Sequence, residues 1–158
     1  MTNATTDTAN LKDTANNTAK IDELMFVKLK IPKLIPRDLI ESVKGRTFTP
    51  EQFYDYQSKQ VDNPYNHLFA LVDSAKKIHG YLWAEVNVLD DSLFINTFSI
   101  SKEFWGKGEA ISKVTEFLDE LRKKIKSSRV FWVTTNERFF LKHGFKRSKN
   151  CLMEYNSN

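Results

Sequence analysis

Two short apolar runs flank an amphipathic stretch between residues 93 and 134 of this 158-residue chain, and few folds accommodate that arrangement. Leu93 to Ile100 and Arg129 to Thr134 have the composition of buried strands. Residues 111–125 place Ile, Val, Phe and Leu at spacings of three and four, which predicts a helix with one apolar face. Because a helix between two such strands favours a parallel crossover, the unit predicts a sheet with a helix packed against it.

The rest of the chain predicts further strands and helices. Asp90-Asp91 between two apolar runs indicates a tight turn and an antiparallel ribbon over residues 78–100. Residues 1–22 are mostly Thr, Asn, Ala and Asp, so we expect a disordered tail there and one domain over 23–158. The predicted fold class is α/β (α+β), a mixed central sheet flanked by helices. The other predicted elements are strands at 24–30, 67–72, 145–147 and 152–155 and helices at 37–44, 49–60 and 136–143.

Composition bears on the cellular setting. The single cysteine, Cys151, has no disulfide partner and belongs to no Cys/His cluster, so we expect no metal site and a reducing compartment. No apolar run approaches the roughly 20 residues of a membrane span, and the N-terminal residues lack the features of a signal peptide. We therefore expect a cytoplasmic protein without membrane contact, in a host cytoplasm if a phage encodes it. The net charge of +4 permits phosphate-bearing partners without indicating nucleic acid.

The turn FWGKGEA, residues 104–110, joins the strand at 93–100 to the helix at 111–125. The first N–H groups of a helix have no partner within it, and with the helix dipole they form an anion site. Gly106 and Gly108 allow a left-handed backbone and a close approach to a ligand, and Lys107 adds a positive charge. These features suit a diphosphate, with an ordinary turn as the alternative.

Two other phosphate-binding motifs fit this turn poorly. A Rossmann site is disfavoured because the turn has no third spaced glycine and no acidic residue at the end of the following strand. A Walker phosphate loop is excluded because no Gly-Lys-Ser/Thr is present.

At two places the sequence resembles the GNAT superfamily of N-acetyltransferases. WGKGEA, residues 105–110, matches the family's Gln/Arg-x-x-Gly-x-Gly/Ala signature at Gly108 and Ala110, with Trp105 in the first place. FFLKHGF, residues 139–145, resembles the aromatic segment that ends in Gly-Phe near the family's C-terminus. A helix and a strand separate the two signatures, as in the family. The resemblance, over roughly residues 24–155, implies a three-layer GNAT-like domain that binds acetyl-CoA and transfers the acetyl group directly to a primary amine.

The resemblance also implies which residues hold acetyl-CoA. Backbone groups of Phe98, Ser99 and Ile100 would pair with the pantetheine arm like an added strand. Asn136 and Phe140 would also contact the cofactor, with Asn136 beside the arm, and the turn would bind the pyrophosphate. The residues expected to bind the cofactor in the turn are Trp105, Gly106, Lys107, Gly108, Glu109 and Ala110.

Two positions bear on catalysis. In the family a carboxylate commonly removes the amine proton, and Glu85, in mid-strand, is the candidate base, with a structural role as the alternative. A Tyr four residues before the glycine of Gly-Phe commonly protonates the leaving thiolate. Here that position is Phe140, which has no proton to give, so the sequence does not identify a general acid.

Two rival functions follow. Phe140 favours a non-catalytic member that keeps the fold and serves as a binding or structural component. The basic cluster at 122–129, with interleaved aromatics, points to a small nucleic-acid-binding domain, although the solvated end of a helix has the same composition. The expected partners are acetyl-CoA and an amine acceptor, either a small molecule or a protein, with nucleic acid disfavoured. We expect a monomer or homodimer.

Overall fold

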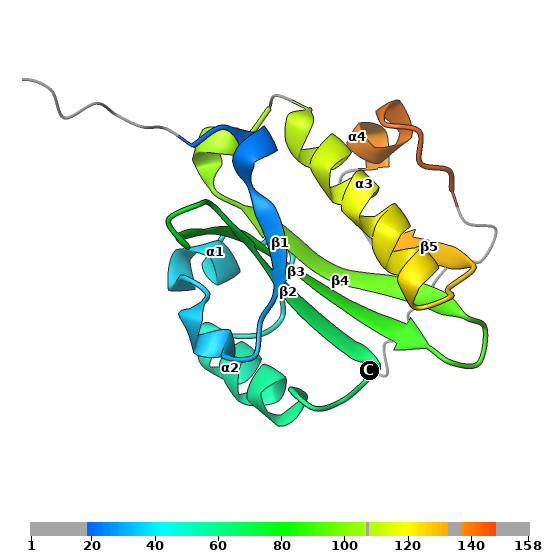
Figure 1. The fold of residues 1–158 in the computed structure, drawn as a ribbon, viewed down its shortest axis with the longest axis horizontal. Coiled ribbons are helices and arrows are strands. Elements are labelled where there is room, and N and C mark those ends of the chain that lie inside the picture. The colour runs from blue at the N-terminus through cyan, green and yellow to red at the C-terminus, as the bar shows by residue number, and fades with distance from the viewer. Residues whose placement is uncertain (1–18, 107, 133–136, 148–158) are drawn as a thin grey trace, which may run out of the picture.

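The computed structural model describes residues 19–106, 108–132 and 137–147, which form a mixed sheet flanked by helices (Figure 1). β1 to β4 are antiparallel and β5 runs parallel to β4, so the predicted ribbon and parallel crossover are confirmed. The strands, in spatial order, are β1 (Met25–Lys28), β2 (Asn66–Val72), β3 (Ile78–Asn87), β4 (Ser92–Ile100) and β5 (Arg129–Trp132). The helices are α1 (Arg37–Glu41), α2 (Pro50–Lys59), α3 (Glu109–Lys124) and α4 (Glu137–Lys142), with 3-10 turns η1 (Ile21–Glu23), η2 (Pro32–Leu34) and η3 (Lys102–Phe104).

The two faces of the sheet carry separate apolar cores. On β3, Tyr81 packs into a cluster with α1 and α2, whereas its neighbour Leu82 packs into a cluster with α3. Because neighbouring residues of a strand point to opposite faces, α1 and α2 cover one face and α3 covers the other (Figure 1). This three-layer arrangement confirms the predicted fold class. The buried stripe of α3 has the predicted spacing and consists of Ile111, Val114, Leu118 and Leu121.

Local signals fix the start of α2. The Thr49 side chain accepts a hydrogen bond from the N–H of Gln52, and the Gln52 side chain accepts one from the N–H of Thr49. This capping box satisfies backbone donors that the helix leaves unpaired, and Pro50 fits the first helical position because it needs no donor. The helix therefore begins where Thr49-Pro50 predicts.

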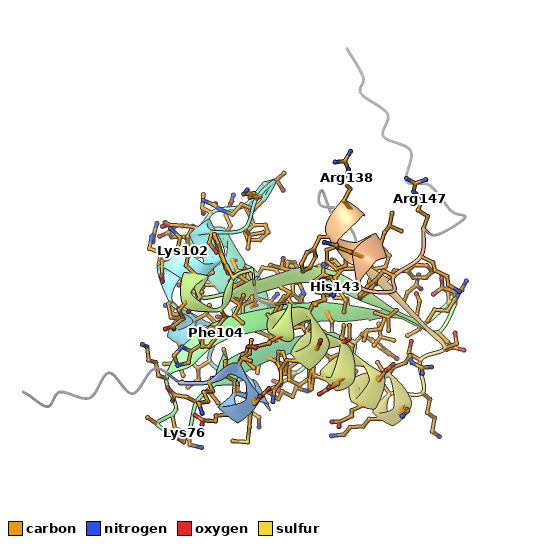
Figure 2. The ribbon with its side chains drawn as sticks, turned by 90° about the horizontal axis from the view of Figure 1, so that it is seen from above. Lys76, Lys102, Phe104, Arg138, His143 and Arg147 are labelled. Atoms are coloured by element: carbon orange, nitrogen blue, oxygen red, sulfur yellow. The ribbon has the colours of Figure 1, made fainter. Side chains whose placement is uncertain are left out.

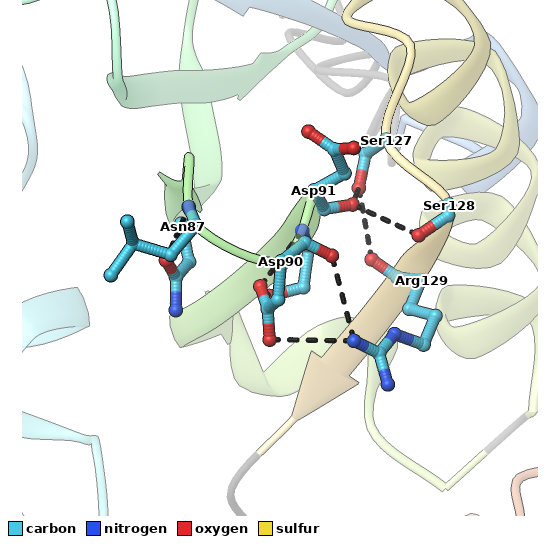
Figure 3. A network of polar contacts seen from close by, with 8 residues as sticks. Asn87, Asp90, Asp91, Ser127, Ser128 and Arg129 are labelled. Carbon is cyan, nitrogen blue, oxygen red and sulfur yellow. Dashed lines mark hydrogen bonds and ion pairs between the residues drawn. The ribbon is translucent and has the colours of Figure 1, made fainter.

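The loop before β5 is fastened to the turn of the β3–β4 hairpin (Figure 3). The carbonyl of Asp91 accepts hydrogen bonds from the Ser127 hydroxyl at 2.7 Å and from the Ser128 N–H at 2.8 Å. A guanidinium nitrogen of Arg129 lies 3.4 Å from the Asp90 carboxylate. These contacts support the pairing of Arg129 with Ser92, which sets the parallel register of β5 on β4.

Gly80 of β3 allows the end of β4 to lie unusually close. A β-carbon at this position would be 2.6 Å from the carbonyl oxygen of Ser99 and 3.3 Å from the Cα of Ile100. Both are backbone atoms that cannot withdraw without disturbing the sheet, so only glycine fits here. The last two residues of β4 are thereby held tightly against β3.

The strand predicted at 145–147 is wrong, because Phe145 terminates α4 instead. The N–H of Phe145 donates to the carbonyl of Phe140 at 3.1 Å, and the N–H of Gly144 donates to that of Leu141 at 3.3 Å. Gly144 has a φ of 85°, and the Phe140 and Phe145 rings pack with centroids 5.0 Å apart. This is a Schellman motif with its apolar contact, and it uses the aromatic that suggested a strand.

The expected boundary of the tail also needs correction. Ile21 is only 4% exposed and packs in a cluster with Leu24 and Phe104, so ordered packing includes residues before 23. Residues 1–18, the strand predicted at 152–155 and Cys151 lie outside the described part of the chain.

Candidate functional site

A cleft of about 580 Å³ lies where the sheet opens beside β4. The pairing of β4 with β5 in the described residues ends at Ile95 and Trp132, and the later residues of β4 line the cleft. Its wall is completed by the segment after α1, by the turn before α3 and by aromatic residues of α4. The lining residues are Ser42 to Phe48, Asn96 to Ile100, Phe104, Trp105, Gly106, Gly108, Ala110, Ile111, Trp132, Phe139 and Phe140.

The backbone of β4 faces this cleft at alternate residues. The N–H of Ser101 donates to the carbonyl of His79 at 2.7 Å, so Ser101 and Ser99 direct their backbone groups toward β3. Phe98 and Ile100 must then direct theirs away from β3. Among the described residues, no other strand pairs with β4 at these two positions, so this side of the strand can receive an extended ligand.

Trp105 partly covers the end of this open backbone. Its indole N–H donates to the carbonyl of Ile100 at 2.8 Å, while half of the residue stays exposed. The ammonium of Lys102 lies 5.9 Å from the centroid of the same ring. The carbonyl of Ile100 is therefore already engaged, which leaves its N–H and both backbone groups of Phe98 for a ligand.

In the turn before α3, the first amides of the helix have no hydrogen-bond partner among the described residues. Gly106 and Gly108 have φ values of 78° and 73°, which confirms the left-handed backbone expected of them. Gly108 is the N-cap of α3 and has no side chain with which to cap the helix. No described residue accepts a hydrogen bond from the N–H groups of Glu109, Ala110 and Ile111, so this end of the helix can bind an anion.

A β-bulge places Asn96 at the other end of the open strand. Trp83 pairs with Thr97 and Ala84 pairs with Ile95, so Asn96 has no partner on β3. Bulges re-aim side chains at functional sites. Asn96 is exposed, lines the cleft and donates through Nδ2 to a carboxylate oxygen of Glu85 at 2.9 Å.

Glu85 reaches the cleft only through this asparagine. Its second carboxylate oxygen accepts a hydrogen bond from the Tyr56 hydroxyl at 2.9 Å, and Glu85 itself does not line the cleft. Burial, and then the hydrogen bond to Glu85, raises the pKa of Tyr56, so the tyrosine remains a donor at neutral pH. The Asn96 side chain thus lies between the Glu85 carboxylate and the cleft.

A buried histidine holds the turn before α3 in place. His79 is 3% exposed, and its two ring nitrogens lie 2.8 Å from a carboxylate oxygen of Asp73 and 3.1 Å from one of Glu103. Its ring also packs edge-on against Phe104. Since Glu103 and Phe104 belong to η3, which directly precedes Trp105, this contact fixes the turn relative to β2 and β3.

Helix α4 closes the cleft with aromatic rings, and a histidine just after it lies beside the turn before α3. Phe140 packs against Trp132 with ring centroids 4.7 Å apart and lines the cleft. A β-carbon on Gly108 would lie 3.5 Å from Cε1 of His143. Figure 2 shows His143 at the sheet-facing end of α4 and Arg138 pointing away from the sheet.

The structure brings most of the predicted cofactor residues into one cleft. Glu109 is the exception among the described residues, because it is exposed and does not line the cleft. Lys107 and Asn136 lie outside the described residues. The segment 42–48 was not predicted as part of the site, because its first three residues were assigned to the helix expected at 37–44, which ends at Glu41, and the rest carries no motif. Asn96 had one usable signal, a polar residue within an apolar strand.

The basic cluster at 122–129 does not form a uniform positive surface. Arg122 and Arg129 lie 3.8 Å and 3.4 Å from the carboxylates of Asp119 and Asp90. Among the described residues no group of three acidic, histidine or cysteine side chains is arranged to hold a metal ion, and no described helix has the length and apolar character to span a membrane.

No family model matches the chain, and no curated protein matches it in sequence. Solved structures match its fold. A possible acetyltransferase from Clostridium difficile 630 has 10% identity and a TM-score of 0.66, covering 85% of this chain and 98% of its own. Mutant forms of the spermidine/spermine N-acetyltransferase SpeG from Vibrio cholerae have 18% identity and a TM-score of 0.67, covering 87% of each chain.

A transcriptional regulator from Bacillus halodurans C-125 also matches, with 14% identity and a TM-score of 0.63, covering 84% of this chain and 99% of its own. The chain therefore has the fold of the GNAT acetyltransferases, as its two signatures predict. At these identities the likeness concerns the fold.

Stability should depend on pH through Asp73. The hydrogen bond from His79 is the main cause that holds the pKa of Asp73 below its ordinary value of 3.8. Because the lower pKa belongs to the folded state, this stabilisation is complete above 3.8 and is lost as pH falls through the folded-state value. In urea unfolding at several pH values, Asp73→Asn should be less stable than wild type at neutral pH, and the two should converge in acid.

Asp62→Asn is the matched control, because Asp62 is exposed and has no described partner. It should follow wild type at every pH. A stability difference for Asp73→Asn that stays constant from neutral pH into acid would contradict the assignment.

Proposed function

We propose that this chain is an N-acetyltransferase that binds acetyl-CoA in the cleft and transfers the acetyl group to a primary amine. The observation that carries the proposal is the meeting, in one cleft, of an open strand backbone and an uncapped helix N-terminus. A pantetheine arm needs an extended partner with amide groups, and a diphosphate needs convergent N–H donors. The fold shared with acetyltransferases supports the same conclusion.

The residues present fit the cosubstrate along its length. The N–H groups at the start of α3 would hold the pyrophosphate, and His143 lies beside Gly108 without lining the cleft. Phe98 and the N–H of Ile100 would pair with the amides of the pantetheine arm. Lys107 and Asn136 keep the roles that the resemblance implies, and the arm then leads from Trp105 toward the bulge at Asn96.

In the transfer, the amine nitrogen attacks the thioester carbonyl, a C–N bond forms, and the C–S bond breaks to release the CoA thiolate. The attacking amine must be neutral and must lose a proton as the amide forms. We propose that Glu85 accepts this proton through a water beside Asn96. The Asn96 amide, held by Glu85, would orient the amine.

The proton for the thiolate has no obvious donor at the family's usual place. Phe140 occupies it, and among the described residues lining the cleft there is no Tyr, Cys or His. We propose that water in this open cleft protonates the thiolate. The absence of a phenol at Phe140 also supports a second candidate function, a binding protein that retains acetyl-CoA without catalysis.

The acceptor of this protein cannot be inferred from the proteins that share its fold. The Vibrio cholerae structures are those of a spermidine/spermine N-acetyltransferase, and 18% identity does not transfer that specificity. A primary amine remains the proposed class.

Gly108→Trp should abolish acetyl-CoA binding. The new side chain would fill the space over the first turn of α3, so the affinity measured by calorimetry should fall by about 100-fold or more, as expected when several charge-assisted hydrogen bonds are lost. Gly144→Trp is the control, because Gly144 has a similar φ of 85° with open space around it. It should retain binding. Unchanged affinity in Gly108→Trp would remove the cofactor site from this turn.

Glu85→Gln should lower kcat and spare acetyl-CoA affinity. Glutamine keeps the shape and loses the charge, so we expect a fall of about 100-fold, the lower range for loss of a general base. Glu120→Gln, on the exposed side of α3, should behave as wild type. A wild-type kcat in Glu85→Gln, measured by thiol release over a range of pH, would assign Glu85 a structural role.

Phe140→Tyr should raise kcat if protonation of the thiolate limits turnover, because it restores a phenol at a position that lines the cleft. Phe139→Tyr adds the same hydroxyl at a neighbouring lining residue and should have no such effect. Equal kcat values for wild type and Phe140→Tyr would show that protonation does not limit the rate.

A further inference from the structure

The rim of the cleft opposite α3 is built by residues 42–48, between α1 and α2. The Ser42 and Ser99 hydroxyl oxygens lie 2.9 Å apart, and they lie 2.9 Å and 2.8 Å from the carbonyl oxygen of Leu39, so one hydroxyl can donate to the carbonyl and the other to its neighbour. Phe48 packs edge-on against Trp83, the partner of Thr97 on β4. The segment is therefore held along β4 between Ser99 and Thr97, next to the bulge where the acetyl group would lie.

Two cations on this segment lack acidic partners. Lys44 is exposed and Arg46 is half-buried, and both line the cleft. The described hydrogen bond of the Arg46 guanidinium goes to the carbonyl of Phe48, and no described carboxylate forms an ion pair with either residue. A guanidinium has five N–H donors, so most of this group is free to bind an anion.

The nearby carboxylates are already engaged. Glu41 and Glu51 both pair with Arg37, away from the cleft. Glu85 is held by Tyr56 and Asn96. Among the described residues that line the cleft there is no Asp or Glu, so its acceptor side presents positive charge.

We infer that the acceptor is a primary amine whose own molecule carries an anionic group, and that Lys44 and Arg46 bind this group. The inference rests on the proposed function and names its acceptor class. The anion would anchor the molecule at the rim and leave its amine free to enter beside Asn96. A polyamine has no group for these cations and is repelled by them.

The test compares amines that differ only in a carboxylate. L-phenylalanine is paired with phenethylamine and L-arginine with agmatine, and spermidine represents the polycations. Acetylation is followed by thiol release, and calorimetric titration of each amine into the CoA-bound protein measures binding independently. The carboxylated member of a pair should be preferred by about tenfold or more in kcat/KM or in affinity, as expected for a hydrogen-bonded ion pair.

The variants locate that preference. Arg46→Gln and Lys44→Gln should each raise KM for the carboxylated amine about tenfold with little change in kcat. Arg46→Lys, which keeps the charge, should retain the preference. Lys33→Gln removes the same charge from an exposed residue outside the cleft and should change nothing. Lys44 has no described bond to lose, so its variant remains informative if Arg46→Gln folds poorly.

Three outcomes overturn the inference while leaving the acetyltransferase proposal intact. The first is acetyl-CoA binding with a preference for spermidine or for the decarboxylated amines. The second is failure of both carboxylated amines to be acetylated or bound. The third is a loss of acetyl-CoA affinity in Arg46→Gln, which would assign the cations to the cosubstrate. Absence of acetyl-CoA binding in wild type would instead refute the proposed function itself.

Discussion

The cleft forms where β4 loses its pairing with β5 and, among the described strands, keeps only β3 as a neighbour. β4 is paired with β3 at every residue except Asn96, but its described pairing with β5 ends at Ile95. Beyond that residue, the backbone N–H and C=O groups of β4 that point away from β3 need other hydrogen-bond partners. An extended ligand with amide groups would supply them, and the start of α3, which has no side-chain cap, lies at the far end of the same strand. In the proposed function, binding would consist largely of completing these backbone hydrogen bonds.

Several contacts keep this exposed edge in place. Gly80 permits the tight approach of Ser99 and Ile100, His79 fastens η3 to the end of β2, and the Trp105 indole satisfies one carbonyl that would otherwise face the cleft. Gly80 and His79 lie behind the cleft surface, whereas Trp105 belongs to its lining. These contacts preorganise the cleft, which would lower the conformational entropy lost on binding.

The two ends of the cleft differ in chemistry. The end at α3 offers backbone amides to phosphates, whereas the end at the bulge offers Asn96 backed by Glu85, with Lys44 and Arg46 on the rim. Phe140 and its aromatic neighbours make the wall between them apolar. In the proposed function, this distribution would separate binding of a long anionic cosubstrate from selection of the acceptor.

The sequence by itself determined the order and type of the main elements and the place of the glycine turn before α3, because these follow from local patterns. The spacing of Ile111 to Leu121 requires a helix, and Gly106 and Gly108 permit the left-handed turn before it. The strand predicted at Phe145 was wrong, because an apolar residue at this place fits either a strand or the end of a Schellman motif. Only the tertiary structure decided that Asn96 forms a bulge, that Glu85 lies behind it and that residues 42–48 form the rim. Those facts depend on strand register and on contacts between residues up to 60 positions apart, which no local pattern in one sequence records.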